Sequence, residues 1–214
     1  MSSVSTAAIV GSYVSVLLGL VVLASVGSIV TYIIIVVANR AEPDPTGNRT
    51  NAIYHVGTAF LTLWLEIAGV ITIFATLFAL IGAGGDRYFS SEIHPLGDAT
   101  IRGITIGLLL SVVGGYVTLN QRHKAIELAE SDGDATSPAK RVVRSYAAIV
   151  SFIGVIVMVI AALAAAWALL GLIAPGVYQV GARSSDVREF LDELIVLAVF
   201  AWVFFTHRRL VGAH

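Results

Sequence analysis

Glu66 most invites a chemical interpretation, because it lies near the middle of an apolar stretch that covers residues 53–83. A charged carboxylate at the centre of a bilayer costs at least about 2.5–3.5 kcal/mol on a lipid-facing helix, so such groups normally face inward and have a partner. Two interpretations compete. A neutral carboxyl group can donate a hydrogen bond to a threonine or a backbone carbonyl and hold two helices together. Alternatively, it can relay protons or bind a cation.

The residues around Glu66 predict that its helix face points into the protein. Polar or small residues recur at steps of three and four, which places them on one helix face, while Leu, Ile and Phe occupy the other. No Asp, Lys, Arg or His lies at the same depth in another apolar stretch, so a proton relay lacks evident partners. We call this set the polar stripe; its members are His55, Thr58, Thr62, Glu66, Gly69, Thr72 and Thr76.

Small residues at every fourth position form a second group of candidate functional positions. They let helix backbones approach closely and gain van der Waals contact, which is the main attraction between helices in lipid. The first interpretation of such a seam is packing within one chain, and the alternative is contact with another subunit. Three separate seams exceed what one compact bundle requires, which supports the alternative. The seams are Gly103, Gly107, Ser111 and Gly115; Gly11, Ser15 and Gly19; and the pairs Ala161/Ala165 and Ala162/Ala166.

A charged cluster precedes the last apolar run. Arg188 and Asp192 are four residues apart, as are Glu189 and Glu193, so each pair shares a helix face. The cluster predicts surface ion pairs, which are individually weak. An ion-binding mouth is the alternative.

No catalytic or cofactor-binding constellation is evident. The chain has no cysteine, which excludes disulfides, thiolate catalysis, Cys-ligated zinc and iron–sulfur clusters. The zinc-protease, P-loop and serine-hydrolase motifs are absent. His55, His123 and His207 fall outside the apolar centres, so we expect no bis-histidine haem. We therefore predict no enzyme activity, no metal and no cofactor, although a groove for a lipid, quinone or carotenoid would leave no motif.

The elements that must position these residues are transmembrane helices. Hydrophobic residues make up 57% of the chain and charged residues 13%, against about 45–50% and about 25% in soluble domains. A helical span needs about 20 residues. The net charge of −1 gives no reason to expect nucleic-acid binding. We predict an all-α integral membrane protein with five spans near residues 7–38, 53–83, 100–119, 146–174 and 187–206.

The distribution of Lys and Arg predicts the orientation. Nine of them fall in the segments 39–52 and 120–145 and in the C-terminal tail, against four on the other side. By the positive-inside rule the N-terminus is outside and the C-terminus inside. We expect the cytoplasmic membrane of a prokaryote.

A weak internal repeat relates the later spans. A shift of 92 residues pairs Tyr54 with Tyr146 and Phe60 with Phe152, and a shift of 86 pairs Tyr116 with Trp202. Two helices per copy make the repeat parallel. The predicted units are an anchor helix with its inner loop (1–50), a first helix hairpin (51–124), a polar linker (125–142) and a second hairpin with a basic tail (143–214).

The second copy carries the sequence Arg144-Ser145-Tyr146 at its start and Trp202-Val203-Phe204-Phe205-Thr206-His207-Arg208-Arg209 at its exit. In these features the chain resembles a bacterial two-helix-repeat membrane family catalogued as a domain of unknown function (number 5671). The resemblance would cover about 51–209 and implies the hairpin architecture, without an activity.

Two functions agree with these patterns. The first is a non-enzymatic scaffold or accessory subunit in the lipid bilayer, which associates with further copies of itself or with other membrane subunits through small-residue helix packing. The alternative is a small proton- or cation-linked transporter or channel that uses Glu66 at the bilayer centre.

Overall fold

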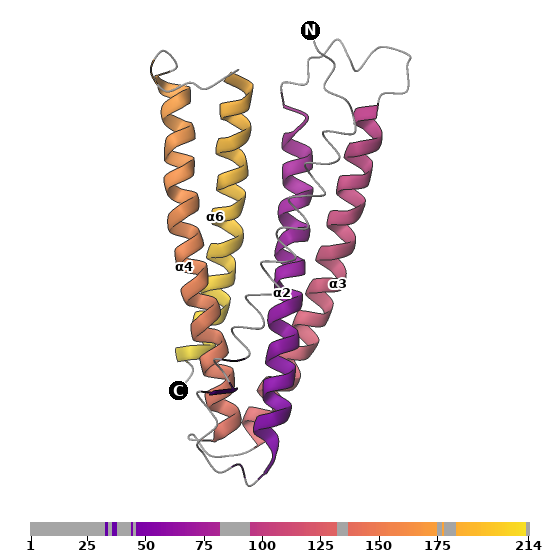
Figure 1. The fold of residues 1–214 in the computed structure, drawn as a ribbon, viewed down its shortest axis with the longest axis vertical. Coiled ribbons are helices and arrows are strands. Elements are labelled where there is room, and N and C mark those ends of the chain that lie inside the picture. The colour runs from indigo at the N-terminus through magenta and orange to yellow at the C-terminus, as the bar shows by residue number, and fades with distance from the viewer. Residues whose placement is uncertain are drawn as a thin grey trace.

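The computed structural model describes residues 48–81, 95–131, 137–174 and 183–212, together with a few isolated positions. It contains the helices α2 (Asn48–Phe78), α3 (Pro95–Ser131), α4 (Pro138–Ile173) and α6 (Arg183–Gly212). These four helices are long and apolar enough to cross a membrane, which confirms the all-α membrane fold class within these ranges. They form two consecutive hairpins, α2–α3 and α4–α6 (Figure 1). The predicted anchor helix over 7–38, with Gly11, Ser15 and Gly19, lies almost wholly outside the described residues.

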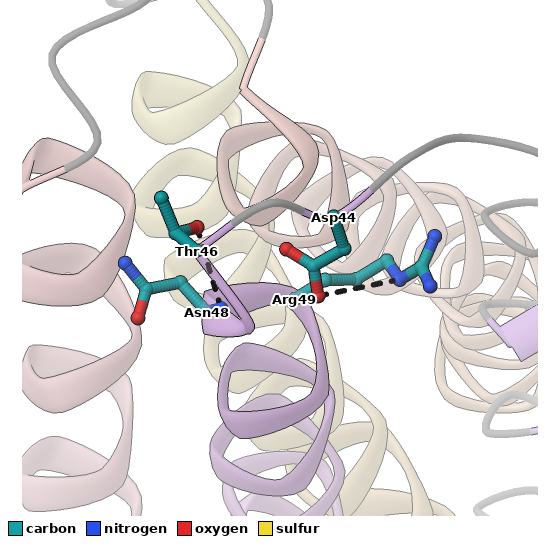
Figure 2. Close-up of polar contacts among 4 residues, drawn as sticks. All are labelled: Asp44, Thr46, Asn48 and Arg49. Atoms are coloured by element: carbon teal, nitrogen blue, oxygen red, sulfur yellow. Dashed lines mark hydrogen bonds and ion pairs between the residues drawn. The ribbon is translucent and has the colours of Figure 1, made fainter.

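Local sequence explains where α2 begins. Gly47 has a φ of 72°, in the left-handed region that glycine adopts most easily. The backbone N–H of Asn48 donates to the Thr46 hydroxyl at 3.5 Å, and Arg49 pairs with Asp44 at 3.8 Å (Figure 2). The chain thus turns into the helix five residues before the apolar stretch that predicted it.

The helix α4 also begins earlier than the hydropathy pattern predicts. Ser137 accepts a hydrogen bond from the Lys140 backbone N–H at 3.2 Å, and Pro138 occupies the first turn. A serine cap followed by proline is a favourable helix start, because it satisfies an exposed N–H and sets the required φ. The boundary of 146 predicted for this span reflects apolar composition only, which ignores a polar first turn.

The up-and-down arrangement brings most of the basic residues to one end of the bundle. At this basic end α2 and α4 begin and α3 and α6 finish (Figure 1). The opposite end, called the far end, contains the start of α3 and of α6. The described parts of the segments that were predicted to lie on the inner side therefore meet at one end of the bundle. The side of the membrane on which this end lies stays a prediction. The basic end contains Arg49, Arg122, Lys124, Lys140, Arg141, Arg144, Arg208 and Arg209.

The core joins the two hairpins in the half nearest the basic end, where α3 and α4 converge (Figure 1). Phe60 of α2 packs edge-on against Tyr146 of α4, with ring centroids 6.4 Å apart. The rings of Trp64 of α2 and Phe200 of α6 also pack together, with centroids 6.0 Å apart. Ala125 and Ala129 of α3 and Ala139 of α4 are buried in the same core. Aromatic rings and alanines thus hold the hairpins together.

Residues that the predicted repeat pairs have different surroundings. Tyr54 is 63% exposed whereas Tyr146 is 1% exposed, and Phe60 is 2% exposed whereas Phe152 is 67% exposed. The hairpins share a topology, but these two pairs lend no support to the repeat, which stays a prediction. The predicted boundary between 124 and 125 falls inside α3, which continues as a helix to Ser131.

Candidate functional site

The polar stripe of α2 faces α3. At its basic end, His55 Nδ1 lies 2.5 Å from Gln121 Oε1. Two turns further along α2, the Thr118 hydroxyl donates to the Thr62 hydroxyl at 2.9 Å. The inward orientation expected from the residue spacing is therefore the observed one, and the face that receives the stripe belongs to the partner helix of the same hairpin.

Glycines of α2 and α3 allow the backbones of these two helices to come almost into contact. A Cβ atom added to Gly114 would lie 2.6 Å from the Glu66 backbone nitrogen and 2.9 Å from the Thr62 carbonyl oxygen. One added to Gly69 would lie 2.6 Å from the Gly107 carbonyl oxygen. Contacts this short leave no room for a side chain. Gly114 was not predicted, although its spacing of seven residues from Gly107 places it on the same helix face.

The predicted small-residue seam of α3 is used inside the hairpin. Gly103 lies against the Thr76 side chain, and Gly107 lies against Ile73 and Gly69. Ser111 approaches Gly69, and its hydroxyl donates to the Gly107 carbonyl at 2.7 Å. Of the two interpretations of this seam, packing within one chain is the one for which the structure provides contacts.

The threonine hydroxyls of the stripe are occupied within α2. Each donates to a backbone carbonyl four residues earlier, which satisfies a hydroxyl in apolar surroundings without water. The stripe therefore offers few free donors to a solute. The bonds run from Thr58 to Tyr54, from Thr62 to Thr58, from Thr72 to Ala68 and from Thr76 to Thr72, at 2.9, 2.9, 2.7 and 2.7 Å respectively.

Glu66 stands apart from this pattern. Its side chain crosses Gly115, where Oε1 lies 3.3 Å from the position that a Cβ atom would take. Within the described helices no hydrogen bond to its carboxyl group is formed. Arg122, seven residues after Gly115 on the same face of α3, is near enough to interact electrostatically with Glu66. The sequence pattern missed this charge because Arg122 follows the apolar part of α3.

A buried tyrosine–histidine pair joins α4 to α6 and was not among the predicted site residues. Tyr146 and His207 are 1% and 2% exposed, and the tyrosine oxygen lies 3.1 Å from His207 Nε2. His207 Nδ1 lies 2.8 Å from the Val203 carbonyl oxygen. Because a carbonyl cannot donate, Nδ1 carries the hydrogen, and Nε2 of the neutral ring accepts from the tyrosine hydroxyl. Burial of His207 could not be foreseen from its position next to two arginines.

The fourth span contributes two small-residue pairs with opposite surroundings. Ala161 and Ala165 are buried, at 1% and 7% exposure. Ala162 and Ala166 are exposed on the outer face of α4. One pair is therefore covered within the chain, and the other is open to lipid or to a neighbouring protein.

The predicted cluster of Arg188, Glu189, Asp192 and Glu193 lies in the far-end turns of α6. Arg188 and Glu189 interact electrostatically with Asp192, and Glu189 and Asp192 with Glu193. The Arg188 Nε atom donates to the Ser184 carbonyl at 3.3 Å. The charges thus share one region, but the described contacts do not include a direct ion pair between them.

The fold and these contacts define a polytopic α-helical membrane protein. In the described parts of the chain, no three His, Asp or Glu side chains are grouped so that they could hold a metal ion. No family model, curated protein or solved structure matches the chain. The resemblance to the two-helix-repeat family therefore stays a prediction.

Proposed function

We propose that the chain is a non-enzymatic scaffold or accessory subunit of a membrane assembly. The observation that carries the proposal is the closure of the polar stripe by α3, because the residues that could form a solute pathway are used for helix packing. Thr62 bonds to Thr118, and Gly69 meets Gly107 and Ser111. A rigid hairpin of this kind presents a defined apolar surface to neighbouring proteins.

The exposed pair Ala162 and Ala166 supplies the surface for association. Both lie on α4 among larger exposed residues, including Val159 and Leu163, which are 54% and 69% exposed. Two alanines one turn apart form a shallow notch that a second helix can enter closely. The glycine seam of α3 is already filled by α2, so this face of α4 is the better candidate for contact with another subunit.

Purification in a mild detergent, followed by native mass spectrometry, tests the proposal. We expect a fixed oligomer or a stoichiometric complex with other membrane proteins. Enlarging the notch residues, as in Ala162→Leu with Ala166→Leu, should dissociate it. Ala198→Leu, at an exposed position of α6, is the matched control and should leave it intact. A wild-type protein that is monomeric and free of partners would contradict the scaffold function.

A transporter remains the second candidate, and the surroundings of Glu66 favour it. Its carboxyl group is not bonded to the threonines around it, and Arg122 is close enough to influence its charge. A carboxyl group of this kind within a span can relay a proton or bind a cation. Under this function, liposomes that contain only this protein would conduct protons or cations, and Glu66→Gln would abolish the flux while the protein still folds.

A further inference from the structure

A second acidic site lies at the far end, where α4 ends and α6 begins. Asp186 in the first turn of α6 is 6% exposed, and its Oδ2 atom is buried without a hydrogen-bond partner. The carboxyl group packs against Gly171 of α4, with Cγ and Oδ2 each 3.2 Å from the position that a glycine Cβ would take. A buried carboxylate oxygen normally has a donor or a cation beside it, so this oxygen requires an explanation.

The last turn of α4, against which Asp186 packs, also carries carbonyl oxygens. The carbonyl of Gly171 would ordinarily accept from the N–H of residue 175, but that residue is proline and has no N–H. The N–H of Ala174 is already used by the Leu170 carbonyl. The last carbonyls of a helix also carry its negative partial charge. Asp186 thus packs against the last turn of α4, in which the Gly171 carbonyl has no N–H at position 175 from which to accept.

We propose that Asp186 and the last turn of α4 bind a monovalent cation of the size of Na⁺. The inference is independent of the scaffold function. All the available donors are oxygen, which suits a hard cation, and helix C-terminal ends are known to coordinate Na⁺ in membrane proteins. One carboxylate balances one positive charge. A Ca²⁺ site takes six to eight oxygens, several of them from carboxylates, and the described residues of this corner do not supply such a set.

The neighbouring charges agree with a cation at this place. Arg188, the nearest described basic residue on α6, directs its Nε atom to the Ser184 carbonyl. Asp192 and Glu193 lie one to two turns further along the same helix, and each interacts electrostatically with Glu189. These acidic side chains make the potential at the far end of α6 more negative and so favour entry of a cation from water.

Thermal unfolding of the full-length protein in detergent, at constant ionic strength, tests the site with NaCl against choline chloride. A ligand that binds only the folded state raises the melting temperature, by about 2–4 °C at about five times its dissociation constant. We expect this rise with Na⁺ for the wild type and for Glu130→Gln, an exposed control at the basic end of α3. Asp186→Asn should remove it. Equal melting temperatures in Na⁺ and choline would overturn the proposal, as would stabilisation by Ca²⁺ without Na⁺.

A second variant keeps the test decisive if Asp186→Asn does not fold. Pro175→Ala restores an N–H that can occupy the Gly171 carbonyl, and it leaves the carboxylate in place. We expect the Na⁺ concentration for half-maximal stabilisation to rise about tenfold, as for the loss of one favourable polar contact. An unchanged Na⁺ dependence in Pro175→Ala would show that the Gly171 carbonyl does not bind the cation. This result would overturn the proposed site between Asp186 and the last turn of α4.

Discussion

Replacing Gly114 with alanine should separate α2 from α3. The added methyl group would lie 2.6 Å from the Glu66 nitrogen, whereas ordinary contacts begin at 3.4 Å, so the helices must move apart by about 0.8 Å. All three of its nearest neighbours are backbone atoms of Thr62 or Glu66, which cannot rotate away as the end of a side chain can. A gap of about 0.5–1 Å forfeits about a quarter to a half of a van der Waals contact energy.

The expected loss follows from this displacement. Overpacking of a tightly packed interior typically costs about 1–3 kcal/mol. For a chain of this size 1 kcal/mol corresponds to about 2–4 °C in melting temperature, so a loss of about 2 kcal/mol lowers it by about 4–8 °C. Thermal unfolding in a mild detergent, followed by tryptophan fluorescence, measures the change. Trp64 lies in the core that joins the hairpins and reports on their separation.

Gly154 provides a matched control for the same substitution. It is also a buried glycine inside a helix, but an added Cβ atom would meet its nearest neighbours at 3.6 Å, which is ordinary contact. Gly154→Ala should therefore leave the melting temperature unchanged or raise it slightly. If Gly114→Ala and Gly154→Ala have the same melting temperature, the close approach of α2 and α3 at Gly114 does not exist.

Three further substitutions test the polar contacts, each by the same unfolding measurement. Thr118→Val removes the bond to Thr62, and since such bonds in membrane proteins average about 0.6 kcal/mol, the melting temperature should fall by about 1–3 °C; a fall of 10 °C would indicate a different role for Thr118. Tyr146→Phe leaves the buried His207 Nε2 without its donor, which should cost about 1–3 kcal/mol, and this cost should shrink when His207 is already replaced by leucine. Equal costs in both backgrounds would show that the pair is not coupled. Thr72→Val removes a hydroxyl bonded only within its own helix, so stability should change by less than about 0.5 kcal/mol, and a larger loss would point to an external partner for Thr72.

The sequence was sufficient to predict the four described helices and the face of α2 that points inward. Runs of apolar residues identify spans, and the three- and four-residue spacing of Thr62, Glu66 and Gly69 identifies a face, because both follow from the helix period. The helix ends were less predictable. Ser137 and Pro138 start α4 in a polar segment that a hydropathy pattern assigns to a loop.

Pairings between distant residues could not be predicted from the sequence. Nothing in the spacing of His207 indicates that it is buried against Tyr146, sixty-one residues earlier. The electrostatic influence of Arg122 on Glu66 also depends on the register between α2 and α3. That register is set by the glycines where the backbones touch, and a single sequence does not show which glycine meets which residue.

Disulfide crosslinking in native membranes tests most directly whether α3 closes the polar stripe. The chain contains no cysteine, so introduced pairs report without background. Thr62 and Thr118, whose hydroxyl oxygens are 2.9 Å apart, should form a disulfide on mild oxidation when both are changed to cysteine. Leu61 and Leu119, which are 41% and 57% exposed, form the control pair and should not crosslink. Efficient crosslinking of the control pair, with none between positions 62 and 118, would show that α3 does not close the polar stripe.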